Sequence, residues 1–246
     1  MPFLISIVHS KMTIYKKGTG VRMRKSTVLV LILLILGGCK YMSNPKKPLT
    51  QYHKKRDFNH TSEPRGSTTS KRKKDRQLFV VQKHAASHLH FDLRLEDRDV
   101  LLSWAVPKGP SLNPQEKRLA IQTEDHPLDY AHFEGIIPQG EYGGGTVMVW
   151  DIGTFELIQK DPKKPITLTK ALAQGHADFI LYGKRLQGTF SLIHAKNFDP
   201  NHWLLIKKDD EFTSTKNIVR AYTRSALSNR TMAQITKDET KKGHHE

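Results

Sequence analysis

Eight short runs of β-branched and aromatic residues, separated by turn residues, constrain the fold of this chain more than any other feature. The runs are residues 78–84, 90–96, 100–107, 118–124, 145–158, 176–183, 188–195 and 202–208. Evenly spaced short strands of this kind favour an antiparallel sheet that closes into a barrel or folds as a sandwich. Two segments are expected to be at least partly helical, residues 166–174, which end before Gly175, and part of residues 221–236.

Charge is distributed unevenly along the 246 residues and divides the chain into parts. The net charge is +16, but residues 77–210 hold 15 basic and 17 acidic residues, so the excess lies in the flanks. A basic flank beside a near-neutral core suits a polyanion such as nucleic acid, or an anionic membrane surface, and a merely solubilising arm is the alternative. The predicted parts are a leader (1–39), a basic arm or linker (40–76), the barrel (77–210) and a C-terminal tail (211–246).

The leader has the order of features found in bacterial export signals. Basic residues at 22–25 precede an apolar run, residues 28–36, which is too short to span a bilayer comfortably. The run ends in LGGC at Cys39, which resembles the lipobox of bacterial lipoproteins and implies cleavage before Cys39 and lipid attachment to its thiol. Met23 is an alternative start, and an uncleaved apolar segment is the alternative interpretation. The chain has one cysteine, which excludes an intramolecular disulfide.

A candidate site lies in residues 82–94, QKHAASHLHFDLR, where polar and apolar residues alternate from His88 onward. Alternate residues of a strand share a face, so one face is apolar and the other carries His88, His90, Asp92 and Arg94. Imidazoles beside a carboxylate suit a divalent metal, and arginine is the usual bidentate anchor for phosphate. The alternative for this pattern alone is a solvated strand face.

Residues outside the alternating stretch 88–94 strengthen the prediction of a site. His84 completes a set with His90 and Asp92 that leaves metal positions open for a substrate oxygen and water. The segment TEDHPLDY places His126 and Tyr130 in a proline-stiffened turn after a strand, where catalytic side chains tend to lie, although packing is the commoner role.

Four segments of the chain together closely resemble a known family. They are QKHAASHLHFDLRLE, SWAVPKGPS, RLAIQTEDHPLDYAHFEGIIPQGEYGGGTV and WLLIKKDD. They are similar to the 3′-phosphoesterase module of bacterial DNA ligase D, which also occurs as a stand-alone protein. The similarity extends upstream to YHKKRDF and Glu63, and covers about residues 52–210.

The resemblance implies a mainly β protein, a compact antiparallel β-barrel of about eight strands with short flanking helices. It implies a phosphoesterase that uses Mn²⁺, with Zn²⁺ or another divalent transition metal as the alternative. Such enzymes trim DNA 3′ ends or primer-templates, removing a 3′-phosphate or a terminal ribonucleotide so that a ligase receives a 3′-hydroxyl. We expect a monomer that acts beside a separate ligase.

The resemblance also implies roles for individual residues. The metal ligands are His84, His90 and Asp92. Arg94 and His126 hold the scissile phosphate, and Tyr130 completes the active site. From the chemistry of these residues, we expect Arg94 and a protonated His126 to offset the charge that builds on the phosphorus centre. The supporting polar positions are Gln82, Lys108 and Arg118, and the residues that assist ribonucleotide removal are Arg56, Asp57 and Glu63.

Two alternative functions come from other classes. His90-x-Asp92 with a distant histidine is also the ligand pattern of non-haem iron oxygenases, although Arg94 and the family resemblance favour phosphoester chemistry. A non-catalytic envelope protein that binds a polyanion through the basic arm is the second alternative.

The leader and the resemblance predict different locations. DNA repair implies the cytoplasm, whereas the leader implies a lipoprotein anchored in a membrane and facing the periplasm or the outside. We favour the anchored protein, because a cytoplasmic enzyme gains nothing from an exposed apolar run. Lys40 follows the cysteine where aspartate favours inner-membrane retention, so the outer membrane is expected in a cell with two membranes.

Overall fold

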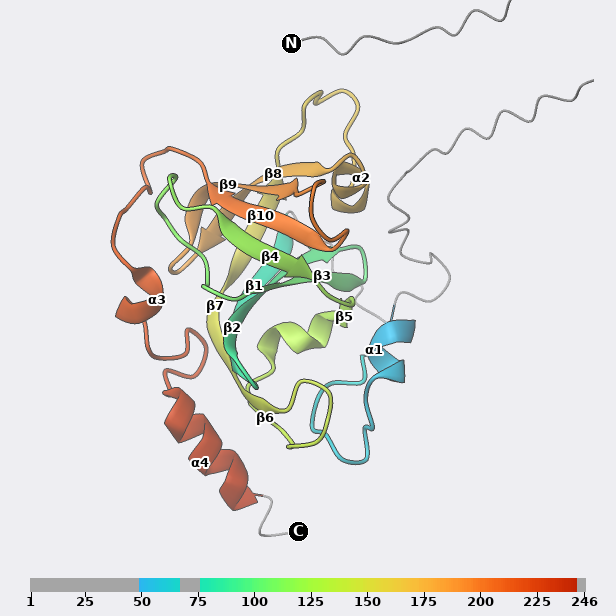
Figure 1. Cartoon of the computed structure of the whole chain (residues 1–246), viewed down its shortest axis with the longest axis vertical. Coiled ribbons are helices and arrows are strands. Elements are labelled where there is room, and N and C mark those ends of the chain that lie inside the picture. Colours follow the sequence, from blue (N-terminus) through green and yellow to red (C-terminus); the bar gives the residue numbers. More distant parts are fainter. Residues whose placement is uncertain (1–48, 67–75, 243–246) are drawn as a thin grey trace, which may run out of the picture. The chain divides into compact units, whose positions relative to one another are not determined.

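The computed structural model describes residues 49–66 and 76–242 (Figure 1). The leader, including Cys39, lies outside the described residues, so its predicted cleavage and lipidation stay predictions. Among the described helices, none combines the length and the apolarity needed to cross a membrane.

Eight strands form a closed antiparallel ring. In ring order they are β1 (Gln77–Ala85), β2 (Leu89–Asp97), β3 (Val100–Val106), β4 (Arg118–Gln122), β10 (His202–Lys207), β9 (Gln187–His194), β8 (His176–Gly183) and β7 (Gly145–Leu157). Pairing of β1 with β7 closes the ring. Each of the eight strands lies on one of the eight runs expected from sequence, so the predicted barrel is confirmed.

Two further short strands and several short helices complete the described fold. The strands β5 (His126–Pro127) and β6 (Gly135–Ile137) pair with β3 and β7, respectively. The helices are α1 (Thr50–Lys54), the 3₁₀ helix η1 (Leu128–His132), α2 (Leu168–Ala173), α3 (Ile218–Ala221) and α4 (Met232–Lys242). The two predicted helical segments contain α2 and the start of α4, and α2 begins after Thr167, whose side chain accepts a bond from the backbone N–H of Lys170.

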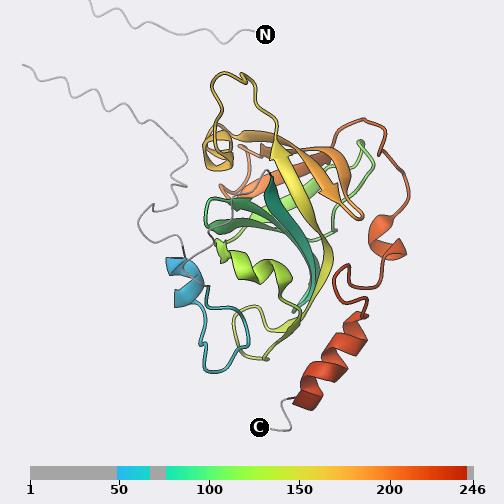
Figure 2. The same cartoon turned by 180° about the vertical axis from the view of Figure 1, so that it is seen from behind.

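Two apolar clusters lie on opposite faces of the strands. The larger cluster takes side chains from all eight strands, including Phe79, Leu93 and Trp104, and therefore fills the barrel. The smaller cluster includes Val80 and Val149, and it packs under α1 and η1. Figures 1 and 2 both show η1 between α1 and the long strands. Because successive residues of a strand point to opposite faces, residues that alternate with the barrel core point toward this covered outer face.

Residues 49–66 lie within the segment whose composition predicted an extended arm, and they pack against the barrel. Tyr52 is fully buried in the smaller cluster, with Phe58 packed beside it. The arm was predicted from the excess of lysine and arginine over residues 40–76, and that composition does not reveal how these two aromatic rings pack. Residues 40–48 and 67–75 lie outside the described part, so the domain boundaries themselves stay predictions.

Candidate functional site

The three predicted metal ligands meet on the outer face of the β1–β2 hairpin. In the antiparallel register His84 lies opposite His90, and Gln82 lies opposite Asp92. The potential ligand atoms of His84, His90 and Asp92 all lie within 4.8 Å of one another. Phe91, which lies between His90 and Asp92 in the sequence, belongs to the barrel core, as the predicted alternation requires.

We call His84, His90 and Asp92 the metal triad. Backbone carbonyls orient both of its imidazoles. His84 donates its Nε2 proton to the carbonyl oxygen of Gly143 at 2.8 Å, and His90 donates its Nδ1 proton to the carbonyl oxygen of His88, also at 2.8 Å. A carbonyl can only accept, so the other ring nitrogen of each neutral imidazole carries a lone pair. Those two nitrogens are the ones that face the Asp92 carboxylate, at 3.5 Å for His84 and 3.6 Å for His90.

This donor set fits a divalent transition metal. Ligands about 2.1 Å from a tetrahedral metal stand roughly 3.4 Å apart, close to the two nitrogen–oxygen distances of the triad. Two nitrogen lone pairs that face a carboxylate repel it unless a cation or a proton lies between them. Carbonyl bonds to the far nitrogens are the usual support for histidine ligands. The metal triad can therefore hold one metal ion through three protein ligands.

Arg94 connects the metal triad to the rest of the site. Its guanidinium is buried and donates to Asp92 at 3.1 Å, to Gln82 at 2.7 Å and to Ser103 at 3.0 Å. Burial opposes ionisation of Asp92, but the Arg94 charge together with His84 and His90 outweighs burial and lowers the pKa of Asp92. Gln82 is fixed in turn by bonds to two backbone carbonyls, so Arg94 is held rigidly.

His126 lies between two guanidinium groups. Its Nε2 is 3.2 Å from Arg56, which can only donate, and its Nδ1 is 2.9 Å from the carbonyl oxygen of Glu124, which can only accept. These two contacts place the proton on Nδ1, so the Arg94 N–H that lies 2.9 Å from Nδ1 makes an electrostatic contact and no hydrogen bond. Burial and the charges of Arg94 and Arg56 lower the pKa of His126 well below its usual 6.5. The imidazole of the free protein is therefore neutral, whereas the sequence analysis expected it to be protonated.

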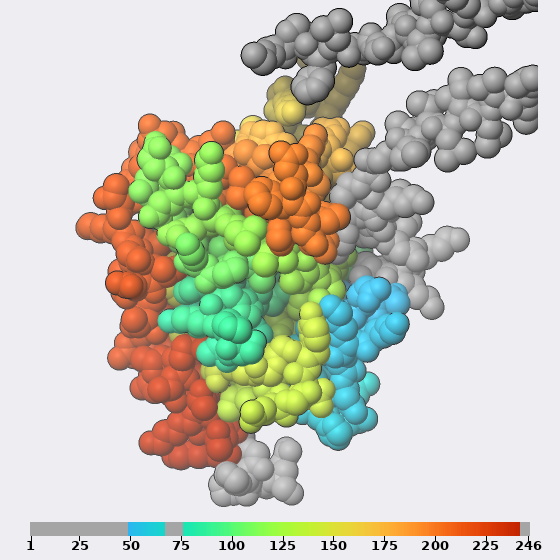
Figure 3. All heavy atoms as spheres, viewed as in Figure 1, coloured from blue at the N-terminus to red at the C-terminus, as the bar shows by residue number. Residues whose placement is uncertain are grey.

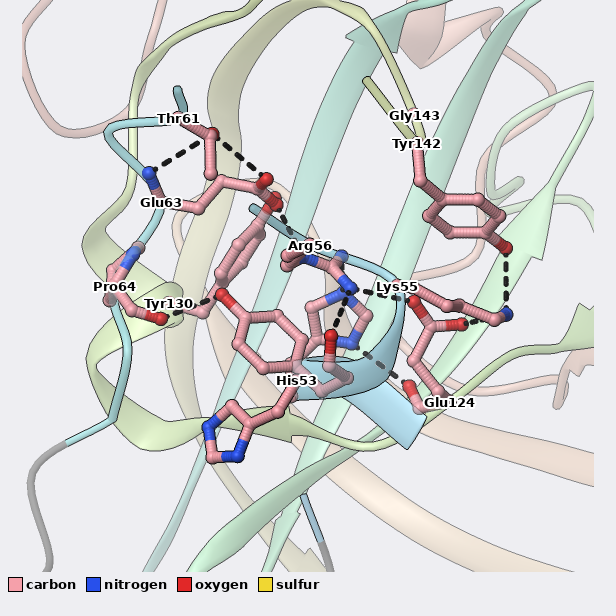
Figure 4. Close-up of polar contacts among 12 residues, drawn as sticks. His53, Lys55, Arg56, Thr61, Glu63, Pro64, Glu124, Tyr130, Tyr142 and Gly143 are labelled. Carbon is pink, nitrogen blue, oxygen red and sulfur yellow. Dashed lines mark hydrogen bonds and ion pairs between the residues drawn. The ribbon is translucent and has the colours of Figure 1, made fainter. Parts of the chain in front are cut away.

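A network of charges links the N-terminal segment to the barrel. Arg56 donates to Glu63 at 2.9 Å and to Glu124 at 3.0 Å, and Tyr130 donates to Glu63 at 2.8 Å (Figure 4). Burial and the Glu63 charge raise the pKa of Tyr130 well above its usual 10, which keeps the hydroxyl protonated. One buried cluster thus joins two distant parts of the sequence: Arg56 and Glu63 from the N-terminal segment, and His126 and Tyr130 from the barrel domain.

Three predicted site residues lie outside this cluster's polar contacts. Asp57 is exposed and accepts the backbone N–H of Asn59. Lys108 is exposed, and Arg118 pairs with Glu116. Their predicted supporting roles stay predictions.

Sequence reasoning missed Glu124, Lys55 and Tyr142. Glu124 accepts bonds from Arg56 and from Lys55, each at 3.0 Å, and Lys55 also donates to the Tyr142 hydroxyl at 3.0 Å (Figure 4). Glu124 stands two residues before His126, and its position beside a predicted site residue was the one available signal. Lys55 and Tyr142 are 87 residues apart, so only the folded structure brings them together.

Comparison with known proteins identifies the barrel. Residues 82–194 match the family described as the DNA Ligase D 3′-phosphoesterase domain. The barrel belongs to this family. The resemblance found in the sequence is thereby confirmed for the segment that carries the metal triad, Arg94, His126 and Tyr130.

Curated relatives share this domain within much longer chains. The multifunctional non-homologous end joining protein LigD of Pseudomonas aeruginosa is 46% identical over 190 residues, which are 76% of this chain and 22% of that protein. LigD of Mycobacterium bovis is 43% identical over 156 residues, 63% of this chain and 19% of that protein. LigD of Mycolicibacterium smegmatis is 39% identical over 165 residues, 66% of this chain and 21% of that protein. The chain spans about a fifth of the length of these relatives.

The charge network predicts a particular acid sensitivity. Burial of Glu124 opposes its ionisation, but bonds from Lys55 and Arg56 outweigh it and lower the pKa of Glu124 from 4.5. A depressed folded-state pKa contributes stability above the unfolded-state pKa, and this contribution is lost as the pH falls through the folded-state value. Between about pH 5 and pH 3, the free energy of unfolding should therefore fall more steeply in the wild type than in Glu124→Gln.

Urea unfolding at several pH values measures both slopes. Glu116→Gln, which makes the same change at a carboxylate whose side chain is 44% exposed, serves as the control and should keep the wild-type slope. Identical slopes for Glu124→Gln and the wild type would contradict the inferred coupling.

Proposed function

We propose that this chain is a divalent-metal phosphoesterase that trims DNA 3′ ends to a 3′-hydroxyl, acting on a 3′-phosphate or a terminal ribonucleotide. The observation that carries the proposal is the metal triad, whose two imidazoles present lone pairs to the Asp92 carboxylate. The match to a domain described as a 3′-phosphoesterase supports the reaction class and the substrate. A 3′-hydroxyl is the end that a separate ligase requires, and we propose that the chain acts as a monomer beside one.

Mn²⁺ is the proposed metal, with Zn²⁺ or another divalent transition metal as the alternative, because imidazole and carboxylate ligands suit both. When bound, such an ion would polarise a phosphoryl oxygen of the substrate. His84 and His90 would hold it through the nitrogens that face Asp92. The remaining steps depend on side chains of the chain itself.

Arg94 would stabilise the negative charge of the phosphoester. A guanidinium has five N–H groups, and the bonds of Arg94 to Gln82, Ser103 and Asp92, together with the N–H that lies against His126, take up at most four of them. The remaining N–H is available to a phosphoryl oxygen. A permanent charge fixed by buried bonds needs no rearrangement as negative charge develops.

His126 would act as a neutral imidazole, and the contact with Arg56 would control whether its Nε2 lone pair is free to accept a proton. An incoming phosphate that attracts Arg56 would release the Nε2 lone pair of His126, which could then accept a proton from water or from a substrate hydroxyl. The 2′-hydroxyl of a terminal ribonucleotide is one such group. This arrangement supports a role for Arg56 and Glu63 in ribonucleotide removal, as the family resemblance implies.

Removal of any metal ligand should weaken metal binding strongly and abolish turnover. The substitutions His84→Ala, His90→Ala and Asp92→Ala should each lower Mn²⁺ affinity by at least about 100-fold, because an incomplete ligand set does not hold the ion in working geometry. Calorimetry measures the affinity. Release of inorganic phosphate from a DNA 3′-phosphate, with Mn²⁺ or with EDTA, measures the turnover.

His176→Ala is a suitable control for these variants, because His176 lies on β8 and pairs with Asp178. It should bind Mn²⁺ and turn over substrate like the wild type. Full Mn²⁺ affinity in any of the three triad variants would remove that residue from the ligand set. Turnover by the wild type in EDTA would contradict a metal-dependent reaction.

We propose that the chain is a membrane-anchored lipoprotein that faces the periplasm or the outside. The support is the leader sequence alone, with its basic cluster, its apolar run and LGGC at Cys39. Extracellular or incoming DNA ends would then be available as substrates, whereas a cytoplasmic location would favour repair.

A labelling experiment distinguishes the two locations. Cells supplied with a fatty-acid analogue should label the wild type but not Cys39→Ser, and the labelled protein should fractionate with membranes. A wild type that carries no label and fractionates with the soluble cytoplasm would contradict the lipoprotein proposal.

A further inference from the structure

Tyr142 is an exposed aromatic ring at the edge of the metal site. It lies in the loop between β6 and β7, and 49% of its surface is exposed. In Figure 3 the atoms of this loop lie beside those of the β1–β2 hairpin and of the N-terminal segment, on one face of the molecule. A large half-exposed ring among polar groups has open surface on which a planar ligand can stack.

The backbone of this loop is coupled to the metal triad. The residue after Tyr142 is Gly143, whose carbonyl oxygen accepts the Nε2 proton of His84 at 2.8 Å. The loop ends at Gly145, where φ is +145° and an added Cβ would lie 2.1 Å from the carbonyl oxygen of Ala85. Only glycine fits there. The position of Tyr142 relative to His84 is therefore set by the backbone.

Two cations hold the ring from the side of the N-terminal segment. The ammonium group of Lys55 is 4.3 Å from the ring centroid and donates to the hydroxyl, and the guanidinium carbon of Arg56 is 5.8 Å from the centroid. Figure 4 shows the ring directed toward Lys55 and apart from the buried Tyr130. Such contacts orient an aromatic ring without covering it.

We propose that Tyr142 is a stacking platform for the base of the 3′-terminal nucleotide. The inference rests on the proposed function and adds how the end is positioned. Stacking on an aromatic ring is sequence-tolerant, because every base has a π-face. An enzyme that trims DNA ends of any sequence needs such a contact, and a ring next to the carbonyl that orients His84 is well placed to supply it. Tyr142 is thus a positioning residue, and the metal triad and Arg94 act on the phosphoester.

Substrate and protein can be varied together to test this stacking. On DNA with a 3′-phosphate, Tyr142→Ala should raise KM by about 5- to 150-fold, the range expected for one lost stacking contact, with little change in kcat. Tyr142→Phe, which keeps the ring but loses the bond to Lys55, should stay within about threefold of the wild type. With an abasic terminal nucleotide, the wild type should lose the same factor and Tyr142→Ala should lose nothing further.

Tyr182→Ala is the matched control. Tyr182 lies on β8, is 37% exposed, and also has a guanidinium over its ring, that of Arg76 at 4.0 Å. Tyr182→Ala should leave the KM unchanged both for DNA with a terminal base and for DNA with an abasic terminal nucleotide. Mn²⁺ affinity should be equal in the wild type and in Tyr142→Ala, because the carbonyl of Gly143 belongs to the backbone.

A fluorescence measurement separates failure of this inference from failure of the proposed function. DNA with 2-aminopurine as its terminal base should lose fluorescence on binding the wild type or Tyr142→Phe, and should lose less on binding Tyr142→Ala, whether or not turnover occurs. Equal quenching by all three, or an abasic penalty that persists in Tyr142→Ala, would overturn the stacking role. Quenching without phosphate release by the wild type would support stacking and overturn the proposed reaction.

Discussion

The antiparallel register between β1 and β2 is the constraint on which the whole site depends. It places His84 opposite His90 and Gln82 opposite Asp92. A slip of either strand by one residue would direct its two site side chains to the opposite face of the sheet, among aromatic residues of the barrel core, and would separate them from their partners on the other strand. The apolar partners in these strands, such as Leu93, therefore fix the register by burial. The metal triad owes its geometry to the same packing that closes the barrel.

Charge balance is the second requirement, because the site is buried. Two guanidinium groups, those of Arg56 and Arg94, lie within hydrogen-bonding distance of His126. Buried cations are tolerated when they are paired, and here the partners are Asp92 for Arg94, and Glu63 and Glu124 for Arg56. The N-terminal segment thus supplies charges that the barrel lacks. The same arrangement keeps His126 neutral, which makes it a candidate proton acceptor rather than a fixed positive charge.

Local sequence patterns predicted the strands and the proximity of His84, His90 and Asp92, but not the contacts between distant segments. The eight strands were predictable because each has β-branched or aromatic residues between turn residues, and the alternation around Asp92 placed its side chain on the polar face. The neutral state of His126 was not predictable, because Arg56, one of the two charges that lower its pKa, precedes it by 70 residues. The contact between Lys55 and Tyr142 also depends on how separate segments pack.

The central claim is that backbone carbonyls hold two imidazoles ready for a metal, and the histidine tautomers test it most directly. Long-range ¹H–¹⁵N spectra of the metal-free protein report which ring nitrogen carries the proton. The account predicts protonated Nε2 in His84 and protonated Nδ1 in His90. On addition of a divalent metal, the ¹⁵N signals of the two unprotonated nitrogens, Nδ1 of His84 and Nε2 of His90, should shift or broaden. A protonated Nδ1 in His84, or a protonated Nε2 in His90, would contradict it.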